Sequence, residues 1–83
     1  MGKKEKLLLK IIQAKSDANI PFKGLCSLLK STGFNERIRG DHHIFTREDI
    51  DEIINIQPKE ALAKPYQVKQ IRSIIIKYNL GDF

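Results

Sequence analysis

The feature that most constrains the fold of this chain is a change of hydrophobic period at Gly33, from helical before it to alternating after it. Three short alternating segments follow, at 34–39, at 42–46 and from 50 or 51 to 57, with two short polar turns between them. Alternation over this length is typical of β-strands with one buried face. Because turns this short join only antiparallel neighbours, the sequence predicts an antiparallel three-stranded meander.

Three other segments carry apolar residues at helical spacing. The first covers residues 3–14, the second runs from Pro21 to a stop at Gly33, and the third opens at Pro65 and closes at Asn79-Leu80-Gly81. Proline suits the first turn of a helix and glycine commonly ends one, which supports these limits. The sequence therefore predicts two helices before the strands and one after them.

The order of these elements predicts an α+β fold. A three-stranded sheet needs one face covered, and the second and last helices are expected to cover it. We expect one domain spanning the whole chain, with a two-layer α-β-β-β-α core at residues 20–80 that has the topology of a double-stranded-RNA-binding domain (dsRBD-like). The polar stretch 16–19 is expected to be a linker, and the additional N-terminal helix at residues 1–15 an appendage. Ile44 and Phe45 compete for the buried side of the middle strand.

Length and charge limit the function. A chain of 83 residues buries a modest core and has no room for a second lobe around a deep cleft, so a small-molecule enzyme is not expected. The net charge of +5 favours a polyanionic partner such as nucleic acid, or an acidic protein. The single cysteine, Cys26, allows no intramolecular disulfide and lies in an apolar helical stripe, as a small buried hydrophobe would. We expect a reduced, cytoplasmic location and no membrane partner.

Both histidines of the chain, His42 and His43, directly follow a predicted Gly40-Asp41 turn, and Arg37 and Arg39 precede them. Imidazole can transfer a proton near neutral pH and guanidinium holds a phosphate through a fork of donors, which is minimal equipment for cutting RNA. Neighbouring residues on a strand face opposite ways, so the histidines are not expected to share a metal ion, and no metal site or cofactor is predicted. The alternative is that one histidine caps the turn and the other packs at a sheet edge.

A metal-free route to RNA cleavage needs one histidine and nearby positive charge. The imidazole takes the proton from a ribose 2′-hydroxyl, or protonates the leaving oxygen, and a cation near the phosphorus stabilises the added charge. Lys64, Lys69 and Arg72 are further candidates for phosphate contact, from the last helix. The lysines of the first helix are expected to form a solvated face instead.

Several runs of the sequence resemble the HicA toxins of bacterial HicAB toxin–antitoxin systems, which are small mRNA interferases. The likeness covers about residues 22–80 and leaves the first helix outside it. It rests on Gly33-Phe34, Gly40 to Phe45, Ile53 to Pro58, Lys64 to Arg72 and Tyr78-Asn79-Leu80.

The resemblance implies the dsRBD-like fold and the toxin of a type II toxin–antitoxin system, a ribonuclease that cleaves mRNA without a required metal. The family's catalytic histidine follows a Gly-Ser pair, which places it at His42 here, with His43 as the second choice. A HicB-type antitoxin is expected to bind over the active site, so the protein would be a monomer or part of a toxin–antitoxin hetero-oligomer. The expected RNA-binding residues are Gly40 at the turn and the basic residues Arg37, Arg39, Lys69 and Arg72.

The sequence departs from the family at Asp41, where serine is usual. The added negative charge can repel the scissile phosphate and weaken activity. Two other classes of function stay open: a non-catalytic RNA-binding module on the same fold, and a protein-interaction domain whose basic face docks an acidic partner. All three functions use the positive charge, but only the toxin uses the histidine.

Overall fold

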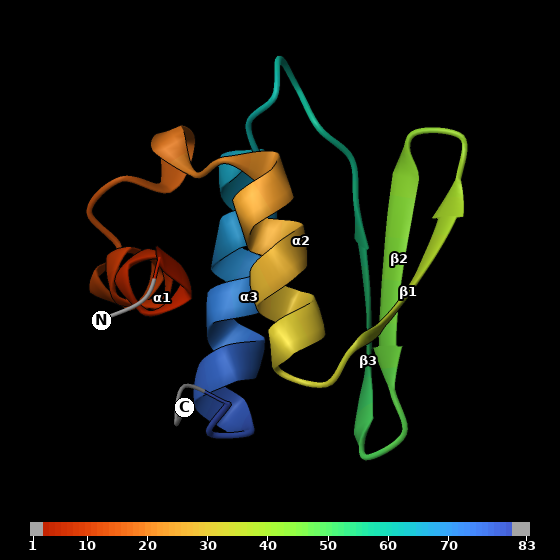
Figure 1. Cartoon of the computed structure of the whole chain (residues 1–83). Coiled ribbons are helices and arrows are strands. Elements are labelled where there is room, and N and C mark those ends of the chain that lie inside the picture. Colours follow the sequence, from red (N-terminus) through yellow and green to blue (C-terminus); the bar gives the residue numbers. More distant parts are fainter. Residues whose placement is uncertain (1–2, 81–83) are drawn as a thin grey trace.

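The computed structural model describes residues 3–80, and their elements follow the order helix, helix, three strands, helix that the sequence predicts (Figure 1). The protein is a small α+β domain with an antiparallel three-stranded sheet. Its elements are α1 (Lys3–Gln13), the 3-10 helix η1 (Asp17–Asn19), α2 (Phe22–Ser31), β1 (Asn35–Arg39), β2 (His42–Arg47), β3 (Ile50–Ile56) and α3 (Pro65–Lys77). The predicted helix-closing Gly81 lies outside the described residues. Asn79 adopts a left-handed φ of 55°, which suits a helix C-terminus.

Strand β2 is the middle strand and pairs antiparallel with β1 and β3, as the meander predicts. The β1–β2 turn needs a left-handed residue, and Gly40 supplies it with a φ of 61°. On the side that faces the helices, Phe45 pairs with Ile54 and both are 0% exposed. Phe45 is therefore the residue of this pair that is buried in the core, and Ile44 lies half-buried on the other side of the sheet.

Helices α2 and α3 lie together on one side of the sheet, and no helix lies on its other side within residues 3–80 (Figure 1). The buried faces of α2 and α3 carry the stripes that their spacing predicts, including Leu25, Leu29, Val68 and Ile71. Burying these side chains against the sheet stabilises both layers. None of the helices in this range is long and apolar enough to cross a membrane.

The first helix is part of the core, so the prediction that it is an appendage is wrong. Leu8 and Ile11 of α1 are buried in the same cluster as the residues of α2, α3 and the sheet. The stretch after it, predicted as a linker, forms η1 and carries Asp17. The Arg72 guanidinium donates to both oxygens of Asp17, at 2.9 and 3.2 Å, and to the carbonyl of Ile11 at 3.1 Å. The Arg72 hydrogen bond lowers the pKa of the Asp17 carboxyl below its ordinary value.

Replacing Arg72 with alanine should destabilise the protein by freeing η1 and the end of α1 from α3. The bidentate pair and the bond to a backbone carbonyl are lost together, and both partners are mostly shielded from solvent. We expect the melting temperature to fall by about 4–8 °C. Thermal unfolding followed by circular dichroism measures it, with Gln70→Ala, an exposed change on the same helix, as the control. A variant Arg72→Ala that melts with the wild type would contradict this role.

Candidate nucleic-acid interface and inner cavity

The two histidines leave β2 on opposite faces of the sheet, as the strand period predicts. His42 lies on the face that no described helix covers, and its side chain is 48% exposed. His43 lies on the helix side, and its side chain is 22% exposed. The structure therefore separates the two candidate acid–base groups into different surroundings.

On the open face, His42 is oriented by a neighbour on β3. Its Nδ1 lies 3.1 Å from the Oδ1 atom of Asn55. Because a carbonyl oxygen only accepts, Nδ1 is the donor in this hydrogen bond, and the neutral form of the ring then has its lone pair on Nε2. This basic nitrogen lies 3.8 Å from the Oδ1 atom of Asp41. An oriented imidazole with one free basic nitrogen is the arrangement that a general base needs.

Two arginines share the open face with His42. Arg39 is the register partner of His42 on β1, and Arg37 is the partner of Ile44 one pair further along. Both arginines are exposed, and neither side chain makes a hydrogen bond or ion pair with another residue in the range 3–80. A Cβ added at Gly40 would meet no atom within 4 Å, so the turn leaves the approach to His42 open. Positive charge without internal partners, beside an open turn, can bind phosphate.

A polar chain links Asp41 to the start of α3. Gln57, with its amide oriented to satisfy both neighbours, donates to Asp41 Oδ2 at 3.2 Å and accepts from Lys64 Nζ at 3.1 Å. Of the three basic residues predicted to contact phosphate from the last helix, Lys64 is therefore the one that lies near His42, through Gln57 and Asp41.

The other two predicted RNA contacts lie elsewhere. The Arg72 guanidinium donates hydrogen bonds to Asp17 and to the carbonyl of Ile11, on the side of α3 that faces α1. Lys69 is exposed on the same helix, and its charge helps to lower the pKa of Asp17. Figure 1 shows α1 on the side of α2 and α3 that faces away from the sheet. The fold thus brings Arg37, Arg39 and Gly40 to His42, but not Lys69 or Arg72.

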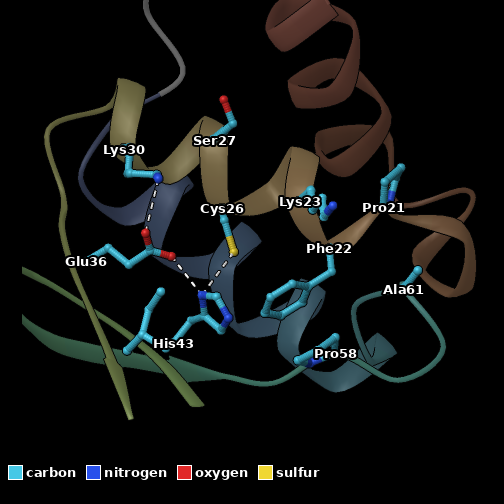
Figure 2. Close-up of a pocket in the computed structure, with 11 residues that line it drawn as sticks. Pro21, Phe22, Lys23, Cys26, Ser27, Lys30, Glu36, His43, Pro58 and Ala61 are labelled. Carbon is cyan, nitrogen blue, oxygen red and sulfur yellow. Dashed lines mark hydrogen bonds and ion pairs between the residues drawn. The ribbon is translucent and has the colours of Figure 1, made fainter. Parts of the chain in front are cut away.

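On the inner face, His43 lies in the wall of an open cavity of about 780 Å³ between α2, β1 and the loop before α3 (Figure 2). Its Nδ1–H donates to Glu36 Oε2 at 2.8 Å, and its ring meets the Phe22 ring edge-on at 4.9 Å between centroids. Lys30 holds the second carboxylate oxygen at 3.1 Å. The hydrogen bonds from His43 and Lys30 keep the pKa of the Glu36 carboxyl below its ordinary value.

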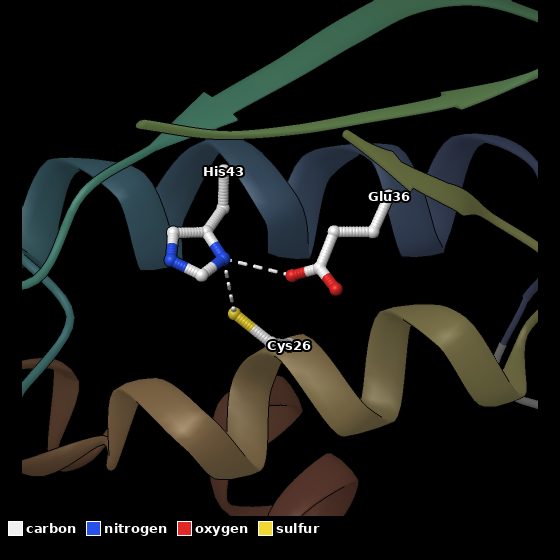
Figure 3. Close-up of side chains that lie close together, drawn as sticks. All are labelled: Cys26, Glu36 and His43. Carbon is white, nitrogen blue, oxygen red and sulfur yellow. Dashed lines mark hydrogen bonds and ion pairs between the residues drawn. The ribbon is translucent and has the colours of Figure 1, made fainter. Parts of the chain in front are cut away.

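Cys26 completes this inner group but is not arranged as a nucleophile. Its Sγ atom lies 4.0 Å from the same Nδ1 that donates to Glu36, so the ring offers the thiol no basic nitrogen (Figure 3). Burial, with the nearby Glu36 carboxylate, raises the pKa of the thiol to about 11. A thiol that stays protonated near neutral pH is a poor attacking group, so the trio does not form a cysteine–histidine catalytic pair.

Sequence reasoning did not place Asn55, Glu36 or Cys26 in either group, although its prediction that Cys26 is buried is confirmed. The role of Asn55 could have been predicted, because the meander places β3 beside β2 and the strand period puts Asn55 on the same face as His42. The signal for Glu36 was its place on the helix side of β1, next to apolar neighbours. No local pattern links Cys26 to either, because it reaches them only through the packing of α2 on the sheet.

Comparison of the chain with protein-family models, with curated proteins and with solved structures finds no match.

Proposed function

We propose that this chain is a metal-independent endoribonuclease of the HicA type, the toxin of a type II toxin–antitoxin pair, with His42 as its acid–base group. The observation that carries the proposal is the place of His42, an exposed and oriented imidazole beside the unpaired Arg37 and Arg39 on an uncovered sheet face. The two helices on the other face support a dsRBD-like core for residues 20–80.

The proposed reaction uses Nε2 of the neutral His42 ring. This atom takes the proton from a ribose 2′-hydroxyl while the 2′-oxygen attacks the adjacent phosphorus. The bond from phosphorus to the 5′-oxygen breaks, the leaving oxygen takes a proton from solvent, and a 2′,3′-cyclic phosphate remains. Arg37 and Arg39 stabilise the extra negative charge on the phosphate, and the Asn55 bond keeps the ring in the tautomer that can act as base.

The open face also suits a protein inhibitor. Ile53 is 61% exposed on it, next to the half-buried Ile44 and the unpaired arginines. A HicB-type antitoxin that carries acidic and apolar side chains would cover this surface and block access to His42. Apolar contacts at the centre and charges at the rim are the usual anatomy of such an interface.

The proposal is tested by incubating the full chain with end-labelled RNA in EDTA. We expect fragments that end in a 2′,3′-cyclic phosphate, because the reaction needs no metal. Binding without cleavage would contradict the nuclease and favour an RNA-binding module. The absence of both would remove RNA as the partner and favour the protein-interaction domain.

The non-catalytic module is the second candidate, and Asp41 is the observation that favours it. Its carboxylate lies 3.8 Å from Nε2 of His42, on the side from which a ribose phosphate would approach. A fixed negative charge there competes with the phosphate for Arg39 and for the imidazole. RNA would then bind through the arginines with a salt-dependent affinity and remain intact.

Changing Asp41 to serine should raise both RNA affinity and cleavage. The substitution removes one negative charge beside the proposed site and keeps a small polar side chain in the turn, so the fold is preserved. Two unit negative charges about 4 Å apart in water repel by roughly 1 kcal/mol, so removing one of them corresponds to about a fivefold change. Filter binding and a cleavage time course measure the two effects, and both should shrink as salt is added. Asp49→Ser, in the β2–β3 turn, is the control for a general change of net charge.

A further inference from the structure

Three side chains of the types that bind metal ions lie close together on the inner face of the sheet. Cys26 comes from α2, Glu36 from β1 and His43 from β2, and their donor atoms converge beside the His43 ring (Figure 3). The ligand atoms all lie within 4.8 Å of one another. A thiolate, an imidazole and a carboxylate are the three donor types that zinc takes in proteins.

Two of the three separations between the ligand atoms are close to those around a tetrahedral ion, and the third is no longer than 4.8 Å. Zinc bond lengths to sulfur, nitrogen and oxygen place such ligand atoms about 3.4–3.6 Å apart. In the structure Oε2 of Glu36 lies 2.8 Å from Nδ1 of His43, and Sγ of Cys26 lies 4.0 Å from it. One contact must open and the other close by roughly half an ångström, which small side-chain rotations supply.

We propose that Cys26, Glu36 and His43 form a binding site for a divalent transition metal ion of the zinc class. The thiolate and imidazole select zinc or cobalt over magnesium and calcium, which prefer oxygen ligands. The site is independent of the proposed ribonuclease activity, because it lies on the opposite face of β2 from His42 and is tested without RNA.

The surroundings complete the site. Lys30 binds Oε1 of Glu36 at 3.1 Å, which leaves Oε2 for the metal and holds the carboxylate in place, as outer-shell partners do. The group lies in the wall of the 780 Å³ cavity, so the fourth coordination position faces space that a water molecule or a small anion can enter (Figure 2). Three protein ligands with an open fourth position are typical of reactive rather than purely structural zinc sites.

Binding has a defined proton balance. The metal takes the Nδ1 lone pair of His43, so the ring proton moves to Nε2, which points away from Glu36 and Cys26 (Figure 3). The Cys26 thiol releases one proton to solvent as it becomes a thiolate ligand. The thiolate, the carboxylate and the dication then sum to zero charge.

The test is a titration of the reduced, full-length protein with Co²⁺ alone, followed by competition with Zn²⁺. We expect a near-ultraviolet sulfur-to-cobalt charge-transfer band and visible bands of a four-coordinate ion, both displaced by Zn²⁺ and removed by EDTA. Cys26→Ser should abolish the charge-transfer band. His43→Ala and Glu36→Gln should each weaken Zn²⁺ binding by at least the roughly 10–100-fold that loss of an outer-shell partner causes.

The matched control is His42→Ala, which removes the other imidazole from the opposite face and should leave the spectrum and the affinity unchanged. Circular dichroism of each metal-free variant establishes that it is folded before the titration. A wild-type protein without the charge-transfer band would overturn the proposal. So would a band that survives Cys26→Ser, or one that His42→Ala abolishes.

Discussion

Replacing His42 with alanine should lower the rate of RNA cleavage by about 10²–10⁴-fold, the contribution of a positioned proton-transfer group. The variant should fold normally, because the His42 side chain is half exposed and its neighbours Asn55 and Asp41 are exposed as well. RNA affinity should change little, since Arg37 and Arg39 remain. The measurement is a single-turnover cleavage assay in EDTA, with binding followed in parallel.

The neighbouring histidine is the control for this prediction. His43→Ala removes an imidazole from the next position of the same strand, but that ring faces the cavity and donates to Glu36. We expect it to keep RNA cleavage and to lose some thermal stability, because a largely shielded carboxylate loses its imidazole partner. The reverse result, cleavage that survives His42→Ala and disappears in a folded His43→Ala protein, would move the reaction to the inner cavity and refute the proposed site.

Replacing Phe45 with alanine should cost about 3–5 kcal/mol of the free energy of unfolding, the usual range for a fully buried phenylalanine. Phe45 is 0% exposed at the middle of the central strand, opposite Ile54. The loss is a large part of the roughly 5–15 kcal/mol that holds a small domain together. Denaturant unfolding at equilibrium, followed by circular dichroism, gives the difference.

Ile44→Ala is the matched control for Phe45→Ala, because it removes a large side chain from the adjacent position on the other face. Ile44 is half-buried on the uncovered side of the sheet, so we expect a cost of roughly 1–2 kcal/mol. Equal costs for the two variants would mean that both faces of β2 are buried in solution. That result would contradict the open face on which the proposed nuclease depends.

Most of the fold could be predicted from the sequence, because helices and strands with one buried face carry apolar residues at regular spacing. The stripes of α2 and α3, the three strands, the Gly40 turn and the opposite directions of His42 and His43 all follow from periods of 3.6 and 2 and from turn chemistry. The place of α1 could not be predicted in the same way. An apolar stripe indicates that a helix buries one face, but not which surface it packs against.

The candidate site, like the fold, has a part that could be predicted from the sequence and a part that could not. Arg37, Arg39 and His42 are close in sequence on two paired strands, so their common face was determined by the strand period and a two-residue turn. Lys69 and Arg72 are predicted to belong to the same site only because they carry positive charge. Charge does not encode position, and the fold uses Arg72 to bind Asp17 instead.

The sequence by itself determined the order of the elements, the alternation of side chains along each strand and the common face of His42, Arg37 and Arg39, whereas the burial of Phe45, and with it the exposure of that face, came from the structure. Only the tertiary structure decided that Cys26, Glu36 and His43 meet at one nitrogen atom. The first set depends on neighbours a few residues apart, whose geometry the backbone repeats impose. The second depends on how α2 docks on the sheet, and that is decided by the packing of the whole core rather than by any local pattern.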